Sequence, residues 1–228
     1  MCLTEHFNTL QFADVYGYIA SVSRRTGDTL ELENGLKIFP GMETDVAEGG
    51  HILSIGPLEA ILELNCRLEP NKEKGCFLSF ARLMDLFEEY PVVVGCGHPF
   101  RAPGHVPELP EEQLRRLKFL DLNGKDLALD QARTERLTYA LGRRLDIPVV
   151  SGSDTHQAVQ YGCVTTVFER ECNTIRPSMR RCGRPLCHPP GGHRPLPGAH
   201  RLPAEAVSEG DPRLGRRLCG YSDSGAIA

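Results

Sequence analysis

The fold is indicated by residues 149–156, which have the sequence VVSGSDTH. A short apolar run ends at a Gly-Ser step and is followed at once by Asp154 and His156. Residues 92–98, VVVGCGH, have the same arrangement and lead to His98. Metal sites in parallel α/β barrels are built where strands end in imidazole and carboxylate side chains. We therefore expect these two segments to supply ligands to one metal site.

Three earlier segments follow the same pattern. Residues 3–6, LTEH, end in His6, residues 39–43, FPGME, end in Glu43, and residues 50–53, GHIL, contain His51. A single His at the end of a strand is usually an ordinary polar residue. Six ligand candidates at the same end of successive strands instead favour metal-assisted hydrolysis.

Short apolar runs alternate with helix-period stretches through the first 170 residues. Strands are expected at residues 36–39, 51–55, 92–94, 119–122, 148–150 and 163–168. Helices are expected at residues 13–25, 80–89, 111–117 and 132–145. The repeated β–α order predicts an α/β fold with a parallel sheet or barrel.

Composition predicts one main domain in this chain of 228 residues. No apolar run reaches the roughly 18 residues of a membrane span, and the N-terminus does not have the pattern of a signal peptide. We therefore expect a cytoplasmic protein without a membrane partner. The nine cysteines are odd in number and never spaced as C-x-x-C, which favours free thiols over a disulfide framework.

The composition changes near residue 171. Residues 171–228 contain eight Pro and eight Gly, and nine Arg against five acidic residues, a net charge of +4. The tail is therefore predicted to be disordered. A shift of reading frame after residue 175 is the alternative explanation. The tail's Cys and His residues (Cys182, Cys187, His188, His193 and His200) do not have the spacing of a zinc finger.

The net charge of the whole chain is −4, so residues 1–170 carry a net charge of −8. An acidic body matches divalent cations better than nucleic-acid phosphates, so nucleic acid is not an expected partner. The sequence leaves the oligomeric state open.

These motifs resemble the signature of the PHP (polymerase and histidinol phosphatase) domain family. The resemblance covers residues 1–170 and rests on five segments in order: LTEH at 3–6, GME at 41–43, GH at 50–51, GHP at 97–99 and GSDTH at 152–156. It implies a distorted (β/α)₇ barrel that holds two or three divalent metal ions and hydrolyses phosphoesters.

The resemblance also assigns roles. It implies that His6, His51 and His98 are imidazole ligands, that Glu43 is the bridging carboxylate, and that Asp154 and His156 complete the set. Glu43, Asp154 and His98 are the residues expected to serve catalysis. A mixture of imidazole and carboxylate suits Zn, Mn or Fe ions.

One motif of the family is absent. Family members begin with a His-x-His pair on an earlier strand, and this sequence contains no such pair. We therefore expect a barrel that is incomplete at its N-terminus. Two alternatives stay open: a truncated, catalytically impaired remnant of a PHP protein, and an amidohydrolase-like deaminase.

Four further residues are candidates for binding a small phosphorylated substrate. Arg101 follows the GHP motif and could bind phosphate oxygens, although it could equally begin a surface loop. His105 lies in the Pro-rich stretch 101–110, and Asn123 and Lys125 follow the predicted strand 119–122. The Asn-Gly step at 123–124 is also typical of a simple turn.

Overall fold

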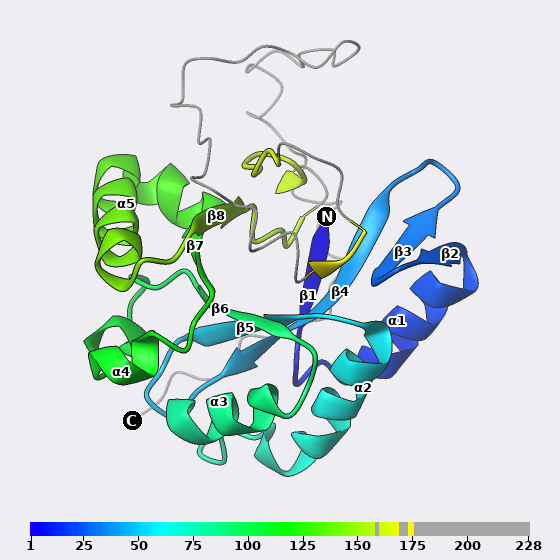
Figure 1. Cartoon of the computed structure of the whole chain (residues 1–228), viewed down its shortest axis with the longest axis horizontal. Helices are drawn as coiled ribbons and strands as arrows, with labels where there is room; N and C mark the ends of the chain where they lie inside the picture. Colours follow the sequence, from blue (N-terminus) through cyan, green and yellow to red (C-terminus); the bar gives the residue numbers. More distant parts are fainter. Residues whose placement is uncertain (158–159, 169–172, 176–228) are drawn as a thin grey trace, which may run out of the picture. The chain divides into compact units, whose positions relative to one another are not determined.

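A mixed β-sheet forms the centre of the fold (Figure 1). The computed structural model describes residues 1–157, 160–168 and 173–175. The chain divides into two units, Met1–Cys187 and His188–Ala228, and the described residues all belong to the first. The strands are β1 (Cys2–His6), β2 (Ser23–Thr26), β3 (Thr29–Leu32), β4 (Lys37–Asp45), β5 (His51–Ile55), β6 (Val93–Gly97), β7 (Phe119–Asn123) and β8 (Val149–Gly152). The α-helices are α1 (Phe12–Ser21), α2 (Leu58–Arg67), α3 (Phe80–Glu88), α4 (Glu111–Leu114) and α5 (Gly124–Leu145), with 3₁₀ turns η1 (Glu69–Asn71) and η2 (Val106–Glu108).

The strands follow the order β2-β3-β4-β5-β6-β7-β8, with β1 paired to β4. The pairs β1–β4, β6–β7 and β7–β8 are parallel, whereas β2–β3, β3–β4, β4–β5 and β5–β6 are antiparallel. The sheet is therefore mixed, whereas the sequence favoured a parallel sheet or barrel. Pairing among the described strands does not close on itself, so the (β/α)₇ barrel remains a prediction.

Side chains alternate between the two faces of β4, as they must in a strand. Met42 and Thr44 are buried on the face that packs against the main hydrophobic core, and Glu43 and Asp45 lie on the opposite face. Figure 1 shows α1, α2 and α3 gathered on one side of the sheet. In α3, the buried residues Phe80, Leu83, Met84 and Phe87 have the i, i+3, i+4, i+7 spacing of an amphipathic helix.

A second, smaller core contains Ile55, Val93, Phe119 and Ile175. These residues come from β5, β6, β7 and the segment at residues 173–175. Ile175 thus packs against these strands, although the predicted domain ended at residue 170.

The register of the strands brings the ligand candidates toward one end of the sheet. His6 pairs with Glu43 across β1 and β4, and Asp45 pairs with His51 across β4 and β5. His51 in turn pairs with Gly97, the residue before His98. Three strand-pairing registers therefore place imidazole and carboxylate residues beside one another.

Several elements agree with the sequence-based expectations. The strand at 51–55 is β5, and the helix at 80–89 is α3 with one residue fewer. The expected helix at 13–25 ends at Ser21, because residues 23–32 form the β2–β3 hairpin around Gly27, whose φ is 63°. Helix α2 and that hairpin were not expected.

The predicted strand at 163–168 is wrong within its described residues. The side chain of Thr166 accepts a hydrogen bond from Ser151 N at 2.7 Å. The backbone N–H of Ser151 thus bonds to a side chain, instead of to the backbone carbonyl of a neighbouring strand.

Three further expectations concern the tail, membrane spans and the cysteines. The predictions for the tail concern residues that lie outside the described part, apart from 173–175. Within the described part, every helix is too short or too polar to span a bilayer. The described cysteines, Cys2, Cys66, Cys76, Cys96 and Cys163, are free thiols.

Candidate metal centre

His51, the first residue of β5, lies between two carboxylates. Its Nδ1 is 2.6 Å from Oε1 of Glu43, and its Nε2 is 3.0 Å from Oδ1 of Asp45. Both carboxylates belong to the same face of β4 because they are two residues apart. The side chain of Glu43 is 17% exposed and that of Asp45 is 19% exposed, so this acidic pair is largely shielded from water.

His98 completes a triangle with Glu43 and His51. Its Nε2 is 2.9 Å from Nδ1 of His51 and 3.4 Å from Oε1 of Glu43. Two ligand atoms bonded at about 2.1 Å to one tetrahedral cation lie about 3.4 Å apart. The distance of 3.4 Å between His98 and Glu43 matches that spacing, whereas the distances of 2.6 and 2.9 Å are those of hydrogen bonds and would lengthen around a cation. The donor set therefore fits a divalent cation with small adjustments.

His6, at the end of β1, approaches the same cluster. Its Nε2 is 3.5 Å from Oδ2 of Asp45, and ligand atoms of His6, Glu43 and His51 all lie within 4.8 Å of one another. Its other nitrogen, Nδ1, is 2.7 Å from Oδ1 of Asn8. Because an amide oxygen can only accept, Nδ1 of His6 carries the proton and Nε2 is left to accept or to bind a cation.

The charges of the cluster are coupled. Burial opposes ionisation of Glu43, but hydrogen bonds from His51 and His98 outweigh it and lower the pKa of the Glu43 carboxyl well below its usual range. Burial likewise opposes the charged form of His51, but hydrogen bonds to Asp45 and Glu43 raise the pKa of its imidazole to about 9. The carboxylates thus attract positive charge, whether from a proton or from a metal ion.

Two ligand candidates have strained backbones. Positive φ in residues other than glycine occurs at His98 (28°), Asp146 (55°) and Asp154 (50°) among the described residues. Asp146 ends helix α5, where a left-handed residue is common. No helix end explains the values at His98 and Asp154. Strain of this kind concentrates at functional sites.

Asp154 and His156 have partners of their own beyond the end of β8. Oδ2 of Asp154 is 2.8 Å from Nη1 of Arg101. Nδ1 of His156 is 2.9 Å from the backbone oxygen of Asp154 and 3.6 Å from its Oδ1. The side chain of His156 is 71% exposed. The structure therefore joins His6, Glu43, His51 and His98 directly, and pairs Asp154 with Arg101 and His156.

The residues expected to bind substrate have varied surroundings. Arg101 contacts Asp126 and Asn123 as well as Asp154. Asn123 is buried and caps helix α5 by accepting hydrogen bonds from the backbone N of the two residues at 125 and 126. Lys125 is exposed, and His105 is exposed with its Nδ1 3.1 Å from Oε2 of Glu108. The turn expected at the Asn-Gly step is thus the start of a helix.

Three residues that sequence reasoning missed belong to the site or its support. Asp45 and Asn8 contact ligand candidates, as described above. Asp121 is buried on β7, where its Oδ2 is 3.0 Å from Nδ2 of Asn123 and 3.5 Å from the backbone N of His98. Burial raises the pKa of the Asp121 carboxyl to about 6. The alternation Met42, Glu43, Thr44, Asp45 is the signal that could have identified Asp45.

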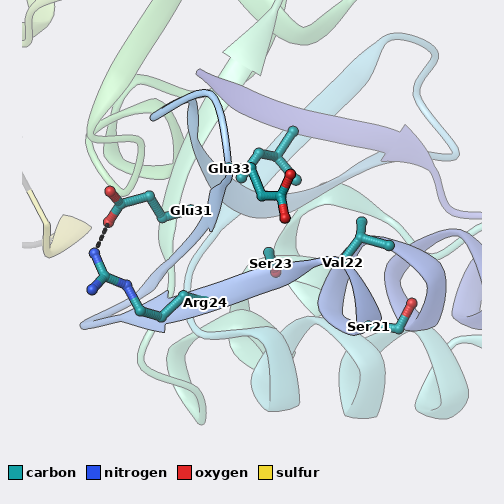
Figure 2. Close-up of a pocket in the computed structure, with 7 residues that line it drawn as sticks. Ser21, Val22, Ser23, Arg24, Glu31 and Glu33 are labelled. Carbon is teal, nitrogen blue, oxygen red and sulfur yellow. Dashed lines mark hydrogen bonds and ion pairs between the residues drawn. The ribbon is translucent and has the colours of Figure 1, made fainter.

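A pocket of about 480 Å³ lies elsewhere, between the end of α1 and the β2–β3 hairpin (Figure 2). It is lined by Ser21, Val22, Ser23, Arg24, Glu31, Leu32 and Glu33. Arg24 and Glu31 form an ion pair at 3.2 Å across it, which Figure 2 shows as a dashed line. Its lining contains none of the ligand candidates.

No protein-family model matches the chain, and no curated protein matches its sequence. Among solved structures, PsfC from Pseudomonas syringae is similar with a TM-score of 0.60 and 21% identity over 79% of this chain and 71% of PsfC. A lesion-specific endonuclease, endonuclease Q from Pyrococcus furiosus, has a TM-score of 0.48 and 18% identity over 68% of this chain and 40% of its own. A protein described as a metal-dependent phosphoesterase from Bifidobacterium adolescentis has a TM-score of 0.45 and 14% identity over 78% of this chain and 83% of its own. The likeness to PsfC shows a shared fold.

Proposed function

We propose that this chain is a metal-dependent hydrolase that acts on a small phosphoester. The observation that carries the proposal is the convergence of three imidazoles and two carboxylates from β1, β4, β5 and the end of β6. Three His side chains around a pair of largely shielded carboxylates are more typical of a functional site than of an ordinary structural cluster. All of these residues except Asp45 lie in the sequence motifs that resemble the PHP family.

The donor set would hold one or more divalent cations. We assign Glu43, His51 and His98 to the inner triangle and Asp45 and His6 to the side facing Nε2 of His51. Asp154 and His156 are the further ligands that the motif resemblance implies. Mixed nitrogen and oxygen donors suit Zn, Mn or Fe ions. When bound, such a cation acts as a Lewis acid toward a phosphoryl oxygen and lowers the pKa of water.

The protein's own residues fix this geometry. Asn8 holds the Nδ1 proton of His6, which keeps Nε2 directed toward the acidic pair. The partly buried carboxylates of Glu43 and Asp45 repel a free phosphate anion unless their charge is neutralised. We therefore expect the activity to depend strictly on added metal.

Metal analysis and hydrolysis assays on the same preparation test the proposal. Purified protein is stripped with a chelator, refilled with Mn²⁺ or Zn²⁺, and analysed for bound metal. Hydrolysis of 4-nitrophenyl phosphate and of bis(4-nitrophenyl) phosphate then separates monoesterase from diesterase activity. Released ammonia from amino-substituted heterocycles, with no release of nitrophenol, would favour a deaminase instead.

Substitutions locate the activity. Glu43→Gln and Asp45→Asn keep side-chain size but remove the negative charge, so each should lower metal affinity and rate by about tenfold to a hundredfold or more. Glu112→Gln is the matched control, because Glu112 is an exposed acidic residue at the start of α4. If Glu43→Gln binds metal and hydrolyses both esters as well as Glu112→Gln does, the proposed site is wrong.

A further inference from the structure

We infer that Arg101 is a positioning residue, which holds Asp154 in place relative to His98, and that it is not a clamp for the substrate phosphate. The inference rests on the proposed function, since it concerns residues assigned to the metal site. It departs from the expectation drawn from the sequence, in which Arg101 binds phosphate oxygens.

The first reason is the use of the guanidinium nitrogens. Nε donates to Oδ1 of Asp126 at 2.8 Å, and Nη1 donates to Oδ2 of Asp154 at 2.8 Å. Nη2 donates to Oδ1 of Asn123 at 2.6 Å. All three nitrogens therefore bond to protein acceptors, in the planar fork geometry that only arginine provides. The two N–H groups that remain, one on Nη1 and one on Nη2, belong to nitrogens that the protein already holds.

The second reason is charge. One guanidinium lies between the carboxylates of Asp126 and Asp154, whose side chains are only 14% and 13% exposed. Both carboxylates already pair with the guanidinium, so a phosphate would have to compete with them for it.

The third reason is that Arg101 belongs to a continuous, partly buried hydrogen-bond network. Its backbone N donates to the backbone oxygen of His98 at 3.1 Å, so a single turn carries both residues. Asn123, which accepts from Arg101, donates through Nδ2 to Asp121 at 3.0 Å. Oδ2 of Asp121 is 3.5 Å from the backbone N of His98. The path runs from the strained residue His98 through β7 to Asp154.

The packing at the start of α5 supports the same path. A Cβ added to Gly124 would lie 3.2 Å from Cα of Ser153 and 3.3 Å from the backbone oxygen of Gly152. Because Gly124 lacks a side chain, the segment that carries Asp154 lies against the helix terminus that Asn123 caps. Arg101 holds one oxygen of Asp154, Oδ2, and the other, Oδ1, lies 3.6 Å from Nδ1 of His156 and is the oxygen that we assign to a cation. Such outer partners usually fix the orientation of ligand carboxylates.

Calorimetric titration of Mn²⁺ into metal-free protein, together with kcat and KM for bis(4-nitrophenyl) phosphate, tests the inference. Arg101→Ala should weaken Mn²⁺ binding by about tenfold to a hundredfold while KM changes little. Arg101→Lys should recover only part of the affinity, because an ammonium group cannot bond to three acceptors in one plane. The matched control is Arg116→Ala, since Arg116 also bridges two acidic residues, Asp85 and Glu88, away from the ligand candidates.

Asp126→Asn separates the two roles of Arg101. If Arg101 is a positioning residue, loss of its Asp126 partner should weaken Mn²⁺ binding in the same direction as Arg101→Ala, by a smaller factor. If Arg101 were a phosphate clamp, Asp126→Asn would release it and lower KM. If melting curves show that Arg101→Ala does not fold, Arg101→Lys and Asp126→Asn still distinguish a positioning residue from a phosphate clamp.

Each outcome is decisive. Unchanged Mn²⁺ affinity with a raised KM in Arg101→Ala would overturn the inference in favour of a clamp. Variants of Arg101 that match Arg116→Ala in affinity and kinetics would also overturn it, while the proposed function stands because wild-type protein binds metal and hydrolyses the ester. Wild-type protein that binds no Mn²⁺ and hydrolyses nothing would refute the proposed function, and the inference with it.

Discussion

Replacement of Tyr16 by Phe should destabilise the edge of the sheet that carries His6. Tyr16 lies on α1 and is fully buried. Its hydroxyl is 2.7 Å from the backbone oxygen of Leu3 in β1, and 2.5 Å and 3.1 Å from the backbone oxygen and nitrogen of Gly41 in β4. The hydroxyl therefore bridges the two parallel strands that place His6 beside Glu43.

The expected loss follows from the number of hydrogen bonds. A hydroxyl has one proton, so it donates to one of the two carbonyls and accepts from the N–H of Gly41. Phenylalanine keeps the ring and its packing against Phe12 but leaves these backbone groups without that partner. Each buried group left unsatisfied costs about 1–3 kcal/mol, so the loss of two partners in Tyr16→Phe should lower the free energy of unfolding by about 2–6 kcal/mol. For a domain of this size, that corresponds to a fall in Tm of about 4–24 °C.

Urea unfolding monitored by circular dichroism measures the effect. Tyr18→Phe is the matched control, because Tyr18 lies on the same helix and is 70% exposed, so its substitution should change stability by less than about 0.5 kcal/mol. Mn²⁺ affinity should also fall in Tyr16→Phe, since β1 positions His6. Equal unfolding free energies for the two variants would refute the reasoning.

Two other predictions concern packing and thiol chemistry. Gly95→Ala should destabilise the protein by about 1–3 kcal/mol in thermal unfolding, because the added Cβ would lie within 2.5 Å of ring atoms of Phe119. Gly17→Ala, in an exposed position of α1 with nothing within 4 Å of the added Cβ, should instead stabilise it by up to about 1 kcal/mol, and equal signs for the two would contradict the packing described. A thiol reagent followed by mass spectrometry should label exposed Cys66 in the native protein and Cys96 only after unfolding, because Cys96 is buried and burial raises the pKa of its thiol. Labelling of both at the same rate would show that β6 is not buried.

The local elements could be predicted where pattern and packing agree. Helix α3 has apolar residues at helical spacing, and all of its periodic positions are buried. The β5 strand is a short apolar run next to turn residues, and it forms at the expected residues. Strand direction could not be predicted in the same way. Whether β5 runs parallel or antiparallel to β4 depends on the short connection at residues 46–50, which lets the chain turn back directly instead of crossing over through a helix.

The buried polar network could not be predicted from the sequence. Asn123 and Gly124 have the composition of a turn, but tertiary partners decide the outcome. Asn123 lies on a fully buried strand, where its side chain caps α5 and contacts Arg101, a residue 22 positions earlier. Such a contact depends on the pairing of β6 with β7, which brings the ends of the two strands together. The expectation that Arg101 binds phosphate came from its neighbours in the sequence alone. It missed Asp126 and Asp154, which contact Arg101 only in the folded chain.

Asp45 shows how far strand periodicity can extend the prediction of a site. If the first ligand-type residue after an apolar run is taken as the candidate, the rule selects Glu43 in this segment. Thr44 comes next, so the rule does not reach Asp45. Alternation in a strand requires Glu43 and Asp45 to share a face, with Met42 and Thr44 on the other. His51 lies directly opposite Asp45 in the antiparallel pair β4–β5, so a carboxylate on that face must meet its imidazole. Pairing and periodicity together therefore indicate a second carboxylate in the cluster beside Glu43.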